Sequence, residues 1–298
     1  MIGETNMAAE GIGPTPGEYI RHHLTHLTNH KQGFIVDFSV INIDSVVISS
    51  LLGALVCFVL WRAARVATAG VPGRFQAAVE ILVEMVDSQA KGVIHNAHSR
   101  KLVAPLALTV FCWIFAMNFM DMLPVDLLPK IWEGIYGAAG HDPHHAYLRV
   151  VPTADLSTTL GLSVSVLLMC VFYNLKIKGL GGWAHELVTA PFGTSKNPVW
   201  ALLLGVTNFL MQMIEFVAKT VSHGMRLFGN MFAGELVFML IALLGGFASL
   251  SLSGGLFFVG HVIAGTVWTL FHILVITLQA FIFMMLALIY LGQAHDAH

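Results

Sequence analysis

Two long apolar stretches near the end of the chain constrain its fold more than any other feature. Residues 199–244 run for about 46 positions without a proline, and residues 255–291 are almost as apolar. As single helices they would reach about 70 Å and about 55 Å, at about 1.5 Å per residue. The hydrocarbon core of a bilayer is only about 30 Å thick, and ordinary tilts do not absorb such lengths. Each stretch therefore either breaks into two spans or lies strongly tilted. We expect two long, tilted helices joined by a turn at 245–255.

The composition fits a membrane protein. Of the 298 residues, 56% are hydrophobic and only 11% are charged, whereas ordinary soluble domains have about 25% charged residues. So few charges cannot cover the surface of a water-soluble globule. The formal net charge of −2 gives no indication of nucleic-acid binding.

Three further segments have the length and hydropathy of a membrane-crossing helix. We therefore expect an all-α membrane protein with about five crossing helices. The expected spans are 44–62, 102–123, 155–176, 199–244 and 255–291. The last two would form a hairpin.

One more helix is expected outside the spans, at about 74–95. It has an apolar face and an opposite face with Glu80, Glu84 and Asp87, which is typical of an amphipathic helix at a membrane surface or against a partner. We expect 41–298 to form a single membrane domain, with 124–154 as its outer loop.

Basic residues predict the orientation in the membrane. The connections 62–101 and 176–196 carry nine Lys and Arg residues, whereas the N-terminal tail and the 124–154 loop carry four. The more basic side faces the cytoplasm, so we expect an extracytoplasmic segment 1–40 and, after five crossings, a cytoplasmic C-terminus. The first 40 residues lack the pattern of a cleavable signal peptide, so insertion is expected to rely on internal segments.

Polar side chains form a stripe on the 199–244 stretch. Charged groups at membrane depth cost about 2.5–3.5 kcal/mol each, so they usually have a function. At 100° per residue, the stripe lies within about 40° of Arg226, and Glu235 points the opposite way. Its members are Asn208, Gln212, Glu215, Lys219, Ser222, Arg226 and Asn230. Glu215 and Lys219 are four residues apart and could equally form an ion pair of their own.

The final stretch carries a second stripe on one helical face. It contains His261, Gly265, Trp268, His272 and Gln279. Glu235 and His261 are expected in the outer half of the membrane, His272 near the middle, and Gln212 and Glu215 in the inner half. Glu and His side chains can exchange protons near neutral pH when burial shifts their pKa values, but a guanidinium stays charged. Arg226 would therefore interrupt a proton path and attract a carboxylate from a neighbouring helix.

Two histidine clusters raise the question of a metal site. They are His22, His23, His26 and His30, and His141, His144 and His145. No Glu or Cys completes a recognisable set of ligands, so we interpret these side chains as solvated or capping, and expect no metal and no cofactor. The three cysteines lie in apolar runs and imply no disulfide. Phosphate-binding and hydrolase motifs are not found, so the chain is not expected to be an enzyme on its own.

Several motifs together resemble one family. Residues 225–236 read M-R-L-F-G-N-M-F-A-G-E-L, which resembles the signature of subunit a of bacterial F-type ATP synthases, where an R-L-F-G-N-M-x-A-G-E run carries the essential arginine. Residues 271–283 are similar to the second signature of that family, on its final helix. Further matches follow in order along the chain, at 41–45, 70–73, 120–129 and 149–152.

The resemblance implies a proton-translocating stator subunit of a rotary ATP synthase in the bacterial inner membrane. Its implied partners are a ring of c subunits, each with a carboxylate at mid-membrane, the peripheral-stalk b subunits and membrane lipid. Nucleic acid and directly bound nucleotide are not implied. The glycines near Arg226, which are Gly224, Gly229 and Gly234, would let the ring helices approach closely.

The resemblance also implies roles for individual residues. Protons would enter through Asn118, Asp121, Glu235 and His272, and would leave through the inner polar groups. Arg226 would separate these two half-channels, and Asn230 and Gln279 would lie on the same path. Enteric members have a glutamate where Gln212 stands, so we expect Glu215 to substitute for it at the inner exit.

Three alternatives remain open. The chain could be a proton-coupled secondary transporter in which Arg226 binds an anionic substrate, although no internal repeat is visible. It could be a sodium-translocating version of the same subunit, although His272 with Glu235 favours protons. It could also be a structural scaffold with packed ion pairs.

Overall fold

The structure is a computed structural model that describes residues 15–30, 33, 37, 39–142, 146–246 and 251–294. The first 14 residues, His144 and His145 of the second histidine cluster, and positions 247–250 of the predicted turn lie outside the described residues. Within the described ranges the chain is almost entirely helical, and its only extended pairing is an isolated bridge between Thr28 and Asn42.

Five helices in the described ranges are long and apolar enough to cross a membrane. They are α2 (Ile43–Val66), α4 (Ala97–Phe119), α6 (Leu156–Thr189), α7 (Pro198–Gly246) and α8 (Leu252–Gln293). The predicted all-α fold with about five crossing helices is therefore confirmed. The remaining elements are α1 (Pro16–Leu24), α3 (Arg74–Val93), α5 (Leu127–Ala138) and the short 3-10 turns η1 (Met120–Met122) and η3 (Pro152–Ala154).

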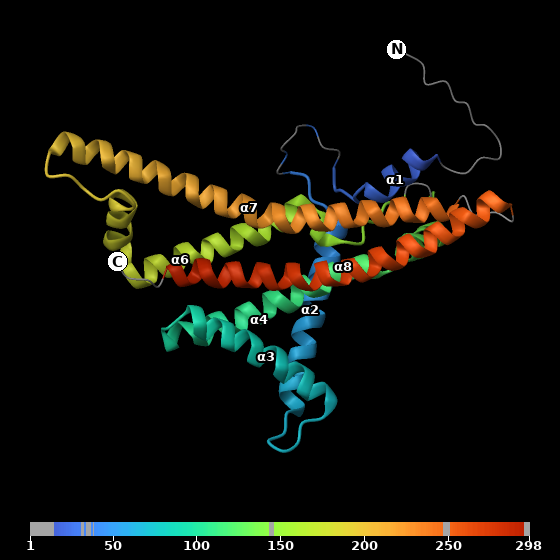
Figure 1. Ribbon diagram of the computed structural model, residues 1–298, viewed down its shortest axis with the longest axis horizontal. Coiled ribbons are helices and arrows are strands. Elements are labelled where there is room, and N and C mark those ends of the chain that lie inside the picture. The colour runs from blue at the N-terminus through green and yellow to red at the C-terminus, as the bar shows by residue number, and fades with distance from the viewer. Residues whose placement is uncertain are drawn as a thin grey trace, which may run out of the picture.

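The two long C-terminal helices are each continuous. Neither α7 nor α8 breaks into two spans, and the two run side by side along the molecule (Figure 1). In the same view α2 runs steeply across them. If α2 crosses the bilayer near its normal, α7 and α8 must lie at a strong tilt, as their lengths require.

Helix α6 is longer than the predicted span 155–176. It continues to Thr189, and Gly179 changes its direction with a positive φ of 70°, a conformation that glycine adopts without steric cost. In the extension Lys178 Nζ lies 2.8 Å from the carboxylate of Glu186. Hydropathy ends the predicted span near Lys176 because the continuation is polar, but the helix itself does not end there.

The outer loop contains a helix that was not predicted. Helix α5 places Leu127, Ile131 and Ile135 at intervals of four residues, and all three side chains are exposed. At 12 residues it is too short to cross a membrane. An apolar stripe on so short a helix is easily overlooked in a loop that begins with Pro124.

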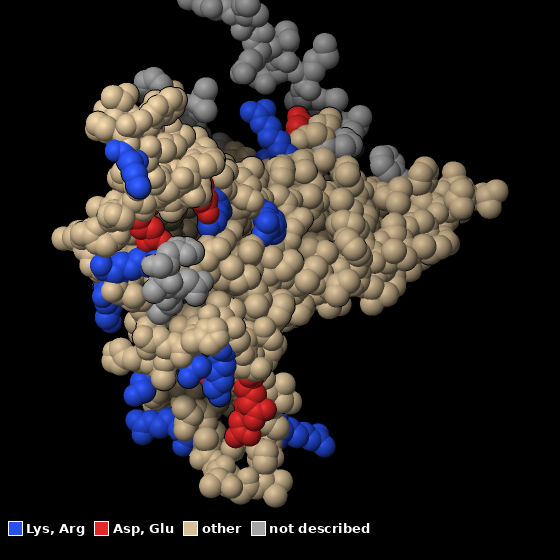
Figure 2. Space-filling view, turned by 60° about the vertical axis from the view of Figure 1, so that its left-hand side comes forward, with Lys and Arg blue, Asp and Glu red and all other residues tan. Residues whose placement is uncertain are grey.

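The core lies where α4 packs on α8 and where α7 packs on α6 and α8. Val103, Ile114 and Met117 of α4 and Met284 and Leu288 of α8 are fully buried in it. No Asp, Glu, Lys or Arg occurs between Glu235 and Asp296. Figure 2 accordingly shows charged side chains gathered on one part of the molecule and a tapering end without any. The Asp, Glu, Lys and Arg residues of α7 therefore all lie at or before Glu235, and the last eleven residues of the helix, 236–246, carry none.

Candidate functional site

Glu235 points from α7 into the protein, where it meets Arg149 from the segment between α5 and α6. Arg149 Nη2 donates to Glu235 Oε2 at 2.7 Å, and the two side chains are only 6% and 9% exposed. The guanidinium of Arg149 also lies over the ring of Phe232, with Cζ 5.5 Å from the centroid. Each buried charge therefore has a partner of opposite sign, which offsets the cost of removing both from water.

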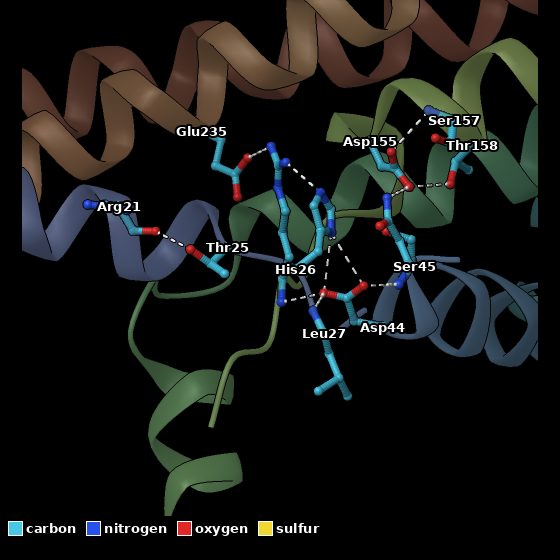
Figure 3. A network of polar contacts seen from close by, with 12 residues as sticks. Arg21, Thr25, His26, Leu27, Asp44, Ser45, Asp155, Ser157, Thr158 and Glu235 are labelled. Carbon is cyan, nitrogen blue, oxygen red and sulfur yellow. Dashed lines mark hydrogen bonds and ion pairs between the residues drawn. The ribbon is translucent and has the colours of Figure 1, made fainter. Parts of the chain in front are cut away.

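The same guanidinium connects Glu235 to the N-terminal part of the chain. Arg149 Nη1 lies 2.9 Å from His26 Nε2. A guanidinium has no acceptor, so Nε2 accepts and the imidazole proton lies on Nδ1. His26 Nδ1 is 3.3 Å from Asp44 Oδ1, which gives a continuous row of polar contacts from Glu235 through His26 to Asp44 (Figure 3).

Asp44 also holds this region together through the backbone. It lies in the first turn of α2, and its Oδ2 accepts the N–H groups of Leu27 and Arg149, each at 3.1 Å. One buried carboxylate thus connects the start of α2 to the segment at Leu27, 17 residues before it, and to Arg149, 105 residues after it. The positions of His26 and Arg149 follow from these bonds.

A second acidic group lies beside α8. His272 Nε2 is 2.7 Å from Asp121 Oδ2, and these side chains are 1% and 5% exposed. The atoms are at ion-pair distance but are not aligned as a hydrogen bond. Gly234 makes room for the imidazole, because a Cβ at this position would overlap the ring. Glycine is therefore required where α7 passes His272.

The two acidic groups of the outer site share a small cavity. A space of about 30 Å³ is lined by Asp121, Glu235 and His23, which is about the volume of one water molecule. Asn118 lies one turn before Asp121 and is completely buried, and its side-chain amide has no hydrogen-bond partner among the described residues. All four predicted entry residues are thus buried in the protein. They are Asn118 of α4, Asp121 of η1, Glu235 of α7 and His272 of α8.

The inner polar residues line a much larger cavity. It has a volume of about 410 Å³, and Gln212 and Glu215 are on its wall. Glu215 also forms the ion pair that its spacing allows, with Lys219 Nζ 2.6 Å from Oε1. Lys219 Nζ is in addition 2.9 Å from Gln293 Oε1 of α8. Glu215 is therefore paired with Lys219 and also lies on the cavity wall, and its role at a proton exit stays a prediction.

Arg226 lies on the outside of α7. It is nine residues from Glu235, which amounts to two and a half turns and places the two side chains on opposite faces. Glu235 is buried, whereas Arg226 and its stripe neighbours Ser222 and Asn230 are exposed. No acidic group among the described residues lies within ion-pair distance of Arg226. Val217, Val221 and Met225 of α7 are also exposed, but they lie about 100–180° around the helix from Arg226, at about 100° per residue.

Other predicted positions have structural roles. Asn208 is fully buried. Its side-chain amide accepts the N–H of Phe192 and donates to the carbonyl oxygens of Val188 and Gly193, so it fixes the connection between α6 and α7. His261 Nδ1 donates to Ile241 O at 2.7 Å, so the second stripe forms the seam between α7 and α8. Gln279 is also buried.

Two sequence interpretations were wrong. His23 and His26 are not solvated, because His23 Nε2 lies 3.1 Å from Asp126 Oδ1 and His26 lies in the buried network. Gly224 and Gly234 do not face outward. A Cβ on Gly224 would meet Thr159 and Leu160 of α6, and one on Gly234 would meet His272. These two glycines serve packing within the chain, and only Gly229 opens onto free space.

Arg149, His26 and Asp44 were missed as site residues. Asp44 and Arg149 lie within the matched motifs 41–45 and 149–152, so the motif matches could have identified them as candidate site residues. His26 carried no signal besides its cluster. No group of three or more His, Cys, Asp and Glu side chains is arranged to hold a metal ion within the described ranges.

Outside the membrane-crossing segments, α1 is tied to the outer loop through Asp126. Tyr19 Oη donates to Asp126 Oδ1 at 2.8 Å. Burial acts to raise the pKa of Asp126, but the Tyr19 hydrogen bond and the charges of Lys130 and His23 outweigh it and hold the pKa below its ordinary value. Burial and the Asp126 carboxylate raise the pKa of Tyr19.

Comparison with known proteins points to one family. A family model described as the ATP synthase A chain matches residues 46–292. The curated protein named ATP synthase subunit a from Paracidovorax citrulli is 78% identical over 292 residues, which cover 98% of this chain and 100% of the relative. The proteins of the same name from Verminephrobacter eiseniae and Acinetobacter baylyi are 71% and 45% identical, again over 98% of this chain and 100% of each relative.

Proposed function

Because this chain belongs to the ATP synthase subunit a family, we propose that it conducts protons through two separate half-channels to a ring of c subunits. The family makes it a non-catalytic, multi-pass membrane component of the F-type ATP synthase complex. The finer parts of the proposal are the half-channels, the separating role of Arg226, and the ring and peripheral-stalk partners.

The position of Arg226 carries this proposal. An unpaired charge at membrane depth costs about 2.5–3.5 kcal/mol or more. Arg226 has no acidic partner among the described residues, so the cation is arranged to meet a carboxylate outside this chain. A carboxylate on each subunit of a rotating ring is such a partner.

The outer groups support an entry path. Asp121, Glu235 and His272 are titratable. Asp121 and Glu235 border a cavity with space for about one water molecule, and His272 lies 2.7 Å from Asp121. Arg149 keeps a fixed cation beside Glu235, so the carboxylate has a partner whenever it gives up its proton. His23 lines the same cavity from the N-terminal side and extends the polar row outward.

The inner groups support a separate exit path. Gln212 and Glu215 line the large cavity about 16–21 Å along α7 from Arg226, at about 1.5 Å per residue. A guanidinium cannot lose its proton under physiological conditions, so Arg226 does not pass protons from one set to the other. A proton must therefore cross this level on the ring. Each proton falling through 100 mV supplies about 2.3 kcal/mol, so several are needed for each ATP.

The N-terminus is proposed to lie outside and the C-terminus in the cytoplasm of the bacterial inner membrane. Sodium transport remains the alternative ion specificity. Titratable groups on the entry path favour protons, and proton-driven synthesis that does not change with sodium concentration would support them.

Replacing Arg226 by Gln in the intact, reconstituted ATP synthase tests the proposal. We expect the complex to assemble and ATP synthesis driven by a proton gradient to fall below detection. Ser222→Ala is the matched control, since it alters the same exposed face one turn away and should synthesise ATP at the parent rate. Coupled synthesis by the Arg226 variant would refute the separating role. Failure of that variant to assemble would instead favour the scaffold alternative.

A further inference from the structure

A buried histidine on α7, His223, has no place in the proton path described above. Its side chain is 2% exposed, and neither ring nitrogen has a hydrogen-bond partner among the described residues. The imidazole packs against Phe283 and Tyr290 of α8, with ring centroids 3.8 and 5.8 Å away. A neutral imidazole has one donor and one acceptor, and buried polar groups of this kind normally find partners.

The inner cavity can supply those partners. His223 lines the same space of about 410 Å³ as Gln212 and Glu215. A water molecule in the liquid takes up about 30 Å³, so the cavity has room for several, and buried water bonds to polar groups that the protein leaves unsatisfied. The imidazole lies on the wall of this cavity. Both ring nitrogens are covered in this conformation, so the ring has to rotate for a nitrogen to contact water that continues toward Glu215.

Positions along α7 show what His223 adds to the path. Glu215 lies eleven residues before Arg226, which is about 16 Å along the helix, whereas His223 lies only three residues before it, at about 4.5 Å. Between Arg226 and Glu215, α7 has no other side chain that is neutral and able to exchange a proton. Without His223, a released proton would have to cross this interval with no relay group on α7. His223 stands at the start of the interval.

The charged and titratable side chains around the imidazole come from three helices. They are Arg226, Lys219 and Glu215 on α7, Glu186 and Cys170 on α6, and Tyr290 on α8. Glu215 is paired with Lys219 and Glu186 with Lys178. Both carboxylates of the cavity wall therefore already have cationic partners. The imidazole, in contrast, has no hydrogen-bond partner among the described residues.

We propose that His223 is a proton-relay residue at the start of the exit path, a role that rests on the proposed function. One imidazole nitrogen takes the proton of a carboxylic acid on the c-ring, so an O–H bond breaks and an N–H bond forms. The N–H bond on the other nitrogen breaks as cavity water takes that proton and becomes hydronium. Rotation of the imidazole then restores the starting tautomer. No other reactant is consumed.

His223→Ala in the reconstituted ATP synthase is the primary test. We expect proton-driven ATP synthesis to fall roughly tenfold. That is less than the about 10²-fold contribution of a typical general acid–base group, because water in the cavity partly replaces the ring. Added imidazole should restore the rate by entering the space left by the side chain. Pyrrole has a similar shape but cannot relay a proton, and should not restore it.

Two more variants keep the inference open to refutation. His223→Asn can hydrogen-bond but cannot exchange protons, so it should be as slow as His223→Ala, and this variant decides the matter if the alanine protein does not assemble. Phe283→Leu changes the packing around an intact imidazole and should keep the parent rate, with no response to added imidazole. A parent rate in His223→Asn, or equal restoration by pyrrole and imidazole, would overturn the relay.

Arg226→Gln measured in parallel separates the two proposals. If that variant loses coupling while the His223 variants work normally, only the relay is wrong. If it stays coupled, the proposed function itself is wrong.

Discussion

The buried pair of Arg149 and Glu235 allows the most quantitative prediction. Replacing Arg149 by Gln removes a charge that donates at 2.7 Å to Glu235 and at 2.9 Å to His26, and it leaves a buried carboxylate without its cation. Removal of one partner from a buried pair costs about 3–5 kcal/mol. At about 2 °C per kcal/mol for a chain of this size, the unfolding midpoint should fall by about 6–10 °C.

The cysteines of the chain provide the assay. Cys170 is buried and Cys112 is half-buried, whereas Cys57 is exposed. In a Cys57→Ser background, a thiol-reactive fluorescent dye would therefore report heating-induced unfolding and little else. The same measurement applies to every variant of the set in one detergent.

A double-mutant cycle decides the interpretation. Glu235→Gln alone should also destabilise, because it leaves Arg149 buried without its carboxylate. The double variant Arg149→Gln, Glu235→Gln should be more stable than the sum of the two losses predicts. Lys130→Gln is the matched control, since it removes an exposed cation whose pairing contributes at most about 1 kcal/mol. An Arg149 variant as stable as the Lys130 control, or strictly additive losses, would refute our reasoning.

Two further predictions concern other parts of the outer site. Gly234→Ala should lower the unfolding free energy by about 1–3 kcal/mol, as overpacked cores do, and should slow ATP synthesis by displacing His272. Gly229→Ala meets open space within the chain and should leave the unfolding midpoint in the dye assay unchanged, and an equal loss of stability in the two variants would contradict the packing argument. The attachment of α1 through Asp126 should be complete above the ordinary pKa of 3.8 and weaken as the pH falls below it, because the folded protein holds that pKa lower. Cleavage of α1 by pepsin should therefore increase at low pH, and Tyr19→Phe should already be cleaved faster at milder pH. A cleavage rate unaffected by Tyr19→Phe would exclude this attachment.

The spans could be predicted because hydropathy is a local property of the sequence. The long stretches 199–244 and 255–291 differ from α7 and α8 by only a few residues at either end. The same method failed for the extension of α6 beyond residue 176, because a helix can leave the membrane and continue as a polar helix. It also missed α5, whose apolar stripe is too short to register as a span.

The candidate site was only partly predictable, for a related reason. Helical periodicity places Arg226 and Glu235 on opposite faces of one helix, and burial agrees with that geometry. The partner of Glu235 is Arg149, which lies 86 positions away in sequence and outside any predicted helix. The contacts of His26 depend in turn on Arg149 and Asp44. Contacts between distant segments depend on tertiary packing, which periodicity along a single segment does not describe.

The continuity of α7 has a consequence for how the chain can vary. Inserting or deleting one residue between Arg226 and Glu235 would shift one of them by about 1.5 Å and turn it by about 100° relative to the other. Glu235 would then swing off Arg149, or Arg226 would swing off the outward face. No bulge or loop in this interval could absorb the error, as a loop between two helices can. Length changes are therefore tolerable at the ends of α7 but not within this interval, where the helix sets both the spacing and the relative directions of Arg226 and Glu235.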